Sequence, residues 1–232
     1  MSSCGNSGRQ KLIVAIDGPS GAGKSSVTKA LAERLGYIHI DTGAMFRTVA
    51  LFVSRLEIDP EDDAALDSLC SRLSIEFDSS GGKSRVMANG EDVTTNIRTP
   101  EISLLTSKIA ARPSVRKHLL LQQQKMGARG GVVLEGRDIG TVVFPDAHVK
   151  FYLTATAEER GRRRYEELKE KGENVSLQQT IADVQQRDQQ DLNRDIAPLR
   201  RADDAIEIDT TDLTPDAVLS RMEILVCKRE KQ

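Results

Sequence analysis

A short apolar segment leads through a glycine-rich turn into a helical pattern, and this arrangement limits how the chain can fold. Residues 12–16 (Leu-Ile-Val-Ala-Ile) are continuously apolar, which is typical of a strand buried on both faces. Beyond the turn, Val27, Leu31 and Leu35 recur at helical spacing. The turn itself, residues 18–25, reads Gly-Pro-Ser-Gly-Ala-Gly-Lys-Ser and fits the phosphate-binding pattern G-x-x-x-x-G-K-[ST].

This loop predicts how a nucleoside triphosphate would be held. Its glycines allow backbone N–H groups to converge on a phosphate chain, and the start of the following helix adds partial positive charge. We expect Lys24 to reach the outer phosphates and the Ser25 hydroxyl to ligate Mg²⁺. The predicted ATP-binding residues are Gly18, Pro19, Ser20, Gly21, Ala22, Gly23, Lys24, Ser25 and Ser26.

Apolar strand patterns alternate with helical patterns along most of the chain. Besides residues 12–16, strands are predicted at about 37–40, 132–134, 148–153 and 205–208. This alternation predicts an α/β fold, a five-stranded parallel sheet sandwiched by helices. Ligands bind at the carboxyl ends of such strands, so we expect the polar segments that follow the first three to converge on one rim. Those segments are residues 18–25, 41–47 and 135–138.

A different pattern interrupts the alternation. Residues 73–77 alternate at period two, and the same pattern runs from Val86 to an Asn-Gly pair at 89–90, a strong hairpin signal. We therefore expect a small antiparallel insert at about 73–96. The predicted organisation is a disordered tail at 1–10, a core at 11–58 and 113–232, an acceptor-binding insert of strands and helix at 59–112, and a short helical lid at 154–172.

Composition excludes several classes of partner. The formal net charge is −2, so there is no overall basic field to attract nucleic acid. No apolar run approaches the ~20 residues that span a bilayer, and the polar first ten residues lack the apolar core of a signal peptide. The three cysteines do not have metal-ligand spacing. We expect a cytoplasmic monomer that binds neither membrane nor nucleic acid.

A phosphate-binding loop by itself does not define a reaction. A GTPase would need an N/T-K-x-D tetrapeptide, which does not occur here. A motor-type ATPase is normally larger, and the Gly-Arg-Asp that follows Glu135 is unusual for that class. A small-molecule kinase needs a second, cationic pocket for the molecule that accepts the phosphate.

Arginines supply such cations after the second and third strands and in two later clusters. The residues are Arg47, Arg137, Arg160, Arg162, Arg163, Arg164, Arg187 and Arg194. Fixed cations are suited to the charge that develops in phosphoryl transfer, and a mobile arginine-bearing lid would also exclude water. The alternative for residues 158–171 is a solvated helix with i,i+4 ion pairs.

Four segments together give the chain a family resemblance. They are Ile16–Lys24, Asp41–Arg47, Glu135–Ala147 and Arg187–Leu199, within a similarity that spans about residues 11–228. The chain resembles bacterial-type cytidylate kinases, nucleoside monophosphate kinases of the P-loop class, which also carry an enlarged acceptor-binding insert. The resemblance implies transfer of the γ-phosphoryl group of ATP to CMP or dCMP, with Mg²⁺, giving ADP and CDP or dCDP.

The resemblance also implies roles for individual residues. Ser107, Arg116 and Asp138 would read the cytosine, whose N4 amine donates to a carboxylate. The residues implied near the sugar are Thr42, Arg187 and Asp191; those implied at the acceptor phosphate are Arg47, Arg137 and Arg194. The residues implied in catalysis are Lys24, Arg137, Arg163, Arg164 and Asp138, with Arg163 and Arg164 in the lid and Ser25 at the metal.

Some alternatives stay open at this stage. Thr42 and Phe46 stand where serine and tyrosine are common in the family, and loss of the hydroxyl at Phe46 would alter acceptor affinity. No general base is required, since positioning and electrostatics carry most of such a reaction, and Asp17 or Asp138 would assist only weakly. The other functions that we consider are a kinase for a different small acceptor, such as UMP or shikimate, and a nucleotide-switched binding protein.

Overall fold

The chain is arranged in two compact units. The computed structural model describes residues 11–78, 85–170 and 172–230. The first unit comprises the described residues up to His39 and from Arg129 onward, and the second comprises Ile40–Ala128. The predicted insert at 59–112 covers fewer residues than the second unit. The predicted boundaries of core, insert and lid stay a prediction. The predicted tail at 1–10 lies outside the described residues.

A parallel sheet forms the centre of the first unit. Its strands are β1 (Ile13–Asp17), β2 (Ile38–Asp41), β6 (Val132–Gly136), β7 (Val149–Thr154) and β8 (Ile206–Asp209). The order is β2-β6-β1-β7-β8, and the chain passes into the second unit along β2. The register places Asp17, the last residue of β1, beside Gly136 of β6 and Tyr152 of β7. The carboxyl ends of these strands therefore meet at one edge.

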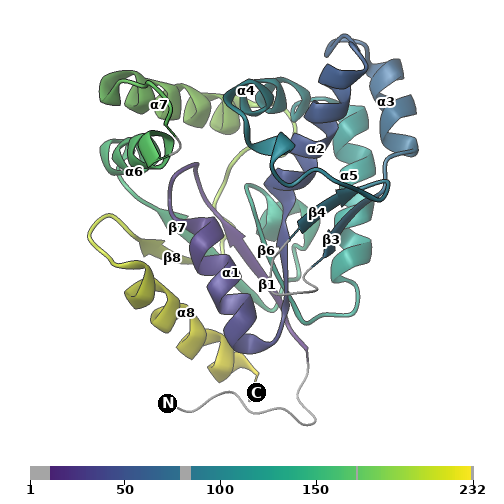
Figure 1. Cartoon of the computed structure of the whole chain (residues 1–232). Helices are drawn as coiled ribbons and strands as arrows, with labels where there is room; N and C mark the ends of the chain where they lie inside the picture. Colours follow the sequence, from purple (N-terminus) through teal and green to yellow (C-terminus); the bar gives the residue numbers. More distant parts are fainter. Residues whose placement is uncertain (1–10, 79–84, 171, 231–232) are drawn as a thin grey trace. The chain divides into compact units, whose positions relative to one another are not determined.

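The helices of the first unit begin where the sequence supplies caps. They are α1 (Lys24–Leu35), α6 (Ala157–Glu170), α7 (Leu177–Asn193) and α8 (Pro215–Arg229). The Ser176 side chain accepts a hydrogen bond from the Gln179 N–H, and Thr214 accepts from the Ala217 N–H. Helix α1 packs against α8, and α6 packs against α7 (Figure 1).

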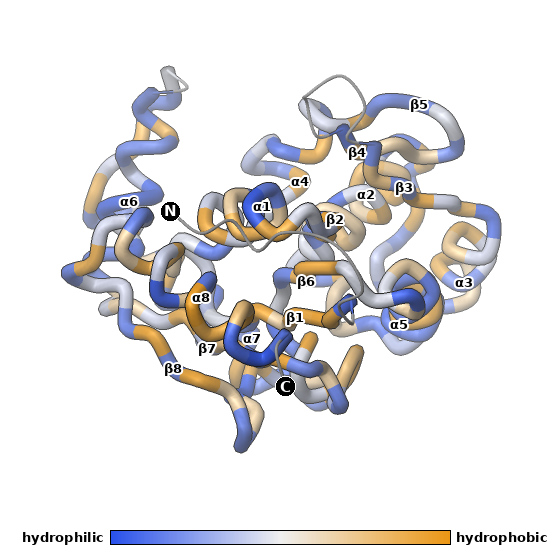
Figure 2. The backbone as a smooth tube through the Cα atoms, turned by 90° about the horizontal axis from the view of Figure 1, so that it is seen from below, coloured by the Kyte–Doolittle hydropathy of each residue, from blue (hydrophilic) through white to orange (hydrophobic). Residues whose placement is uncertain are grey.

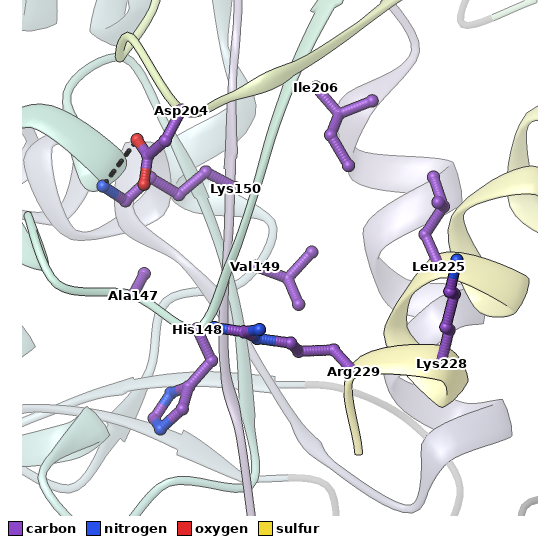
Figure 3. A pocket seen from close by; sticks show the side chains of 9 residues that line it. All are labelled: Ala147, His148, Val149, Lys150, Asp204, Ile206, Leu225, Lys228 and Arg229. Carbon is purple, nitrogen blue, oxygen red and sulfur yellow. Dashed lines mark hydrogen bonds and ion pairs between the residues drawn. The ribbon is translucent and has the colours of Figure 1, made fainter. Parts of the chain in front are cut away.

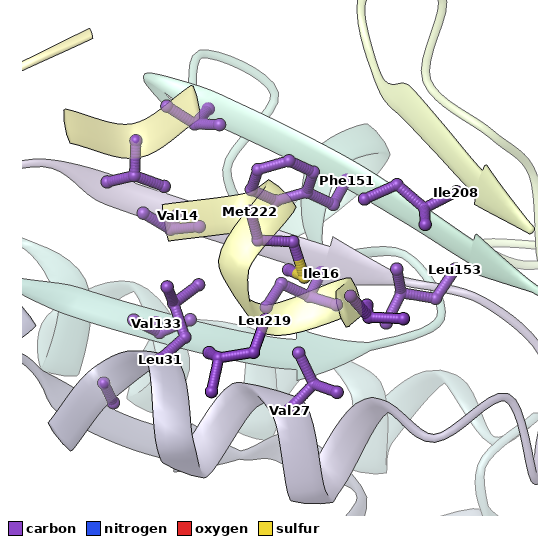
Figure 4. Close-up of a cluster of buried hydrophobic side chains, with 14 of the residues drawn as sticks. Val14, Ile16, Val27, Leu31, Val133, Phe151, Leu153, Ile208, Leu219 and Met222 are labelled. Carbon is purple, nitrogen blue, oxygen red and sulfur yellow. The ribbon is translucent and has the colours of Figure 1, made fainter. Parts of the chain in front are cut away.

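The core of the first unit lies between the sheet and the α1–α8 pair. Val14 and Ile16 of β1 and Phe151 of β7 contact apolar residues of both helices, among them Leu31 and Met222 (Figure 4). Strand β1 is strongly apolar, whereas α6 is largely hydrophilic (Figure 2). No helix in the described ranges combines the length and apolarity that a membrane span requires.

The second unit combines helices with a small antiparallel sheet. Its helices are α2 (Thr42–Arg55), α3 (Asp63–Ser71), α4 (Pro100–Ile109) and α5 (Pro113–Gly127), with a 3₁₀ turn at Asn96–Arg98. Its strands are β3 (Ile75–Asp78), β4 (Arg85–Ala88) and β5 (Glu91–Asp92). Both Asn89 (φ 49°) and Gly90 (φ 84°) have positive φ, which suits the predicted two-residue hairpin turn.

The parallel sheet flanked by helices and the separate small antiparallel sheet confirm the predicted fold class. Two features had no counterpart in the sequence analysis. One is the order of the strands, which places β6 between β2 and β1. The other is a π-helical turn at Ile139–Val143, directly after the Gly-Arg-Asp segment.

Candidate active site

The phosphate loop lies between the end of β1 and the start of α1, as predicted. Gly18 has φ 145°, and a Cβ atom there would lie 2.0 Å from the carbonyl oxygen of Leu153. No residue other than glycine fits this position, because both the backbone conformation and the close approach to β7 exclude a side chain. Gly23, with φ 83°, then caps α1.

Lys24, the first residue of α1, is folded over its own loop. Its Nζ donates to the carbonyl oxygens of Gly18 (2.7 Å) and Pro19 (2.6 Å), and the residue is 6% exposed. Burial and the positive charge of Arg137 lower the pKa of Lys24 well below its usual value. The carboxylates of Glu135, Asp17 and Asp191 offset this only in part, and a polyphosphate placed in the loop would supply further negative charge.

Glu135 joins the phosphate loop to β2. The Ser25 Oγ donates to Glu135 Oε2 at 2.7 Å, and His39 Nε2 lies 2.9 Å from Glu135 Oε1. A hydroxyl and a carboxylate at this spacing are the oxygen ligands that Mg²⁺ prefers. The described residues contain no group of three or more His, Cys, Asp or Glu suited to a metal ion. Phosphate oxygens and water would therefore have to complete the coordination of a magnesium ion here.

A charged cluster lies beyond the end of β6. The Arg137 Nε donates to Asp191 Oδ2 at 2.7 Å. Arg194 approaches both Asp191 Oδ1 (3.7 Å) and Asp138 Oδ1 (3.6 Å). Burial by itself would lower the pKa of Arg137, but the Asp191 carboxylate outweighs it and raises the pKa. Burial likewise opposes ionisation of Asp191, yet Arg137 holds the pKa of that carboxyl below its usual value. The structure thus brings together four of the predicted acceptor-binding residues, all of them charged.

The arginines of α6 differ in what they contact. Arg160 donates to the carbonyl oxygens of Ser20 in the phosphate loop and Ala155, and forms a 2.7 Å ion pair with Asp188 of α7. Arg163 donates to the side chain and carbonyl oxygen of Thr210. Arg164 pairs with Glu167 on the same helix, so the structure leaves it on the surface of α6.

The second unit holds the remaining predicted residues. Asp41 caps α2 by accepting from the Ala44 N–H (2.8 Å) and also pairs with Arg47 (2.8 Å). The Arg116 guanidinium lies 5.5 Å from the centre of the Phe46 ring. The phenyl ring thus provides a cation–π surface at the position where the family commonly has tyrosine.

The other three predicted residues lie on helices α2, α4 and α7. Thr42 is buried in the first turn of α2, and Ser107 is half-buried near the end of α4. Arg187 is half-buried on α7, one turn before Asp191.

Sequence reasoning missed the contacts of Glu135, Asp188 and Asp17. The sequence signals were weak: Asp17 and Glu135 are acidic residues near the ends of apolar strands, and Asp188 is one of several acidic residues in a polar helix. What identifies them is the partner, which in each case is distant in sequence; Ser25 and Glu135, for example, are 110 residues apart.

A parallel sheet, a phosphate loop with its buried lysine, and a cationic cluster at the same edge define a P-loop kinase. The match to known proteins is more specific. The cytidylate kinase family model matches residues 14–227, nearly the whole chain. The chain belongs to the cytidylate kinase family and is therefore a phosphotransferase.

Relatives support this assignment over almost their full length. The chain is 65% identical to a cytidylate kinase of Geobacter sulfurreducens over 97% of this chain and 96% of the relative. It is 55% identical to one of Syntrophotalea carbinolica (96% and 94%) and 45% identical to one of Bacillus pumilus (97% and 100%). The chain also aligns with a solved shikimate kinase from Acinetobacter baumannii, over 97% of each chain, at 15% identity and a TM-score of 0.48. This similarity is too distant to bear on the substrate.

Proposed function

We propose that this enzyme transfers the γ-phosphoryl group of ATP to CMP or dCMP, producing ADP and CDP or dCDP. The observation that carries the acceptor assignment is the buried carboxylate of Asp138 beside Arg137, Asp191 and Arg194. A carboxylate can accept a hydrogen bond from the exocyclic amine of cytosine, and the neighbouring guanidinium groups can bind a phosphate.

On the donor side, the loop N–H groups bind the ATP phosphates and Lys24 neutralises the outer ones. To do so, its Nζ leaves the carbonyl oxygens of Gly18 and Pro19. Ser25 would hold Mg²⁺, with Glu135 as the adjoining carboxylate. When bound, Mg²⁺ would neutralise charge on the β- and γ-phosphates.

On the acceptor side, Arg47, Arg137 and Arg194 bind the phosphate of the nucleotide. Ser107, Arg116 and Asp138 bind its base, and the residues at its sugar are Thr42, Arg187 and Asp191. The carboxylate of Asp191 holds the Arg137 guanidinium in place, so little side-chain entropy is lost when the acceptor binds. Fixed cations of this kind stabilise the charge spread over the transferred group.

The lid completes the site. Arg163 and Arg164 move toward the phosphates when helix α6 closes, and water is excluded so that ATP is not hydrolysed. Positioning and electrostatics supply most of the rate, without a dedicated general base. The enzyme acts as a cytoplasmic monomer with only these small molecules as partners.

The test is ADP release from Mg-ATP with CMP, dCMP, UMP, AMP, GMP or shikimate, each offered separately. We expect strong turnover with CMP and dCMP and weaker turnover with UMP. Turnover only with a different acceptor would reassign the substrate. ADP release that does not depend on any acceptor would favour a nucleotide-switched protein instead.

The D138A variant tests the base-binding role. We expect the KM for CMP to rise about tenfold or more, because the partner of the cytosine amine is lost, while the KM for ATP changes little. D183A, which removes an exposed carboxylate of α7, serves as the matched control. Equal changes in both KM values for D138A would instead place Asp138 with the magnesium or the transferred phosphate.

A further inference from the structure

The carboxylate of Asp17 connects the phosphate-loop strand to the acceptor cluster. Asp17 is the last residue of β1 and directly precedes Gly18. It is 4% exposed, and its two oxygens accept separate backbone hydrogen bonds: Oδ1 from the Ile139 N–H (2.8 Å) and Oδ2 from the Gly140 N–H (2.7 Å). Both N–H groups belong to the π-helical turn that follows Arg137 and Asp138 without a gap.

We propose that Asp17 is a positioning residue for the phosphate acceptor, which fixes the turn bearing Arg137 and Asp138 to the strand that begins the phosphate loop. This proposal rests on the proposed function, because it assigns Arg137 and Asp138 to acceptor binding. In-line transfer requires the donor and acceptor groups to be held at a set separation. Asp17 is the side chain that spans these two parts of the site, with one short bond to each of two adjacent N–H groups.

A carboxylate is the side chain that suits this task. Two neighbouring N–H donors need two acceptor oxygens, which an amide cannot supply because its NH₂ group would face one of them. Gly140 lies close to two side chains, since a Cβ atom there would lie 3.1 Å from Lys150 Cδ and 3.4 Å from Asp17 Oδ2. The turn therefore packs against Lys150 as well as Asp17.

The geometry also argues against a role for Asp17 as a general base. Both of its oxygens are engaged by backbone donors, and the residue is almost completely buried. Burial raises the pKa of Asp17 to about 6, with a smaller contribution from Asp138, while the two N–H bonds and Lys24 lower it. Tyr152 is a further titratable neighbour, beside Asp17 in the sheet. The chain thus keeps an unfavourably buried charge that anchors the turn.

The isosteric variant D17N tests the proposal. We expect the KM for CMP to rise roughly 10- to 100-fold, with the KM for ATP within about threefold of wild type. D209N is the matched control, because Asp209 also ends a strand of this sheet but is exposed and accepts from the N–H and hydroxyl of Thr211, two residues away. A purely structural role predicts a lower melting temperature with no split between the two KM values, and that outcome would overturn the proposal.

A second variant covers the case in which D17N does not fold. G140A places a methyl group 3.1 Å from Lys150 Cδ, which must shift slightly, and in van der Waals contact with Asp17 Oδ2 at 3.4 Å; every charge stays in place. We expect a smaller rise in the KM for CMP than in D17N, with the KM for ATP unchanged; an equal rise in both KM values in folded G140A would count against the proposal.

A measurement without acceptor separates this proposal from the proposed function. In D17N, amide hydrogen exchange across residues 137–143 should quicken relative to wild type and D209N. If the wild type phosphorylates no nucleotide, the proposed function fails, yet faster exchange would still support the anchoring of the turn. Unchanged exchange would overturn it.

Discussion

Single residues in this site combine burial with charge, and Lys24 shows the consequence for catalysis. Its ammonium group is almost fully buried and lies against two carbonyl oxygens. Burial and Arg137 both disfavour its charged form. A group in this situation binds a polyphosphate strongly, because the ligand relieves an electrostatic cost that already exists in the protein.

We expect K24M to lower kcat by about 10²- to 10³-fold, since it removes charge stabilisation from the transition state. K29M, on the exposed face of the same helix, controls for loss of a lysine from α1. Steady-state kinetics with Mg-ATP and CMP measure both. A kcat for K24M within tenfold of wild type would remove Lys24 from the catalytic set.

The buried carboxyl group of Asp17 makes the free energy of unfolding depend on pH. Its pKa in the folded protein is about 6, raised from 3.8 mainly by burial, so the folded state binds the proton more tightly than the unfolded chain does. The free energy of unfolding therefore decreases as pH rises through this interval. D17N lacks this titration. Relative to wild type, its free energy of unfolding should increase by about 2 kcal/mol between pH 4 and pH 7.

Urea unfolding of both proteins across that pH range measures the difference. The lost hydrogen bond of D17N shifts its stability by a similar amount at every pH, so the slope of the difference isolates the carboxyl group. A difference that does not vary with pH would mean that Asp17 titrates as it does in the unfolded chain.

At the scale of elements, Arg160 links α6 to several parts of the first unit, beside the packing of α6 on α7 and the hydrogen bonds from Arg163 to Thr210. The Arg160 side chain connects the phosphate loop, the end of β7 and helix α7. Among the described residues, the ion pairs of the nearby Arg162 are with Glu159 and Glu166, both on its own helix. Arginine thus stabilises tertiary structure at position 160, whereas at position 162 it lies on a solvated helix face.

We expect R160A to lower the free energy of unfolding by about 3–5 kcal/mol, because it leaves the Asp188 carboxylate buried without its counter-charge. ATP binding should weaken as well, since the Ser20 carbonyl loses its donor. R162A should leave the melting temperature and ATP affinity nearly unchanged. Thermal unfolding and calorimetric titration with ATP compare the two variants; equal effects would contradict the assignment of Arg160 as the anchor.

At the scale of the whole molecule, one apolar layer between the parallel sheet and the α1–α8 pair stabilises the first unit. Leu219 of α8 belongs to this layer and is 4% exposed, whereas Ile224 on the same helix is 68% exposed. The site stands at the carboxyl edge of the same sheet. Packing that fixes the strands therefore also fixes the loops that carry the chemistry.

L219A should lower the free energy of unfolding by about 2–5 kcal/mol, because it removes buried surface and leaves a cavity. I224A should change it by no more than about 0.5 kcal/mol. Denaturant titration of both variants measures this. Similar losses would mean that α8 is held by something other than its inward face.

A hollow lies at the opposite edge of the sheet. A cavity of about 250 Å³ is lined by His148, Lys150, Asp204, Lys228 and Arg229, among others, at the starts of β7 and β8 and the end of α8 (Figure 3). Lys150 and Asp204 pair across it at 2.8 Å. None of the predicted site residues lines this cavity, so it is distinct from the proposed active site.

Much of the fold could be predicted because its signals are local. The glycine-rich loop, the caps at Ser176 and Thr214, and the Asn-Gly hairpin all depend on backbone groups within about four residues of one another. The pattern of apolar strands likewise predicts the parallel sheet. The rule that ligands bind at the carboxyl ends of such strands predicts the edge of the sheet at which the site lies.

The sequence by itself determined which segments become strands and helices, where the phosphate loop lies, and which family the chain resembles. Only the tertiary structure decided that β6 lies beside β1, and this adjacency brings Asp17 to the turn at 139–140 and Glu135 to Ser25. It also decided that Arg160 is buried while Arg162 is exposed. The physical reason is that a hydrogen bond or ion pair forms between groups that the fold brings within about 3 Å. When two such residues are more than 100 positions apart, no local sequence pattern indicates that they will be in contact.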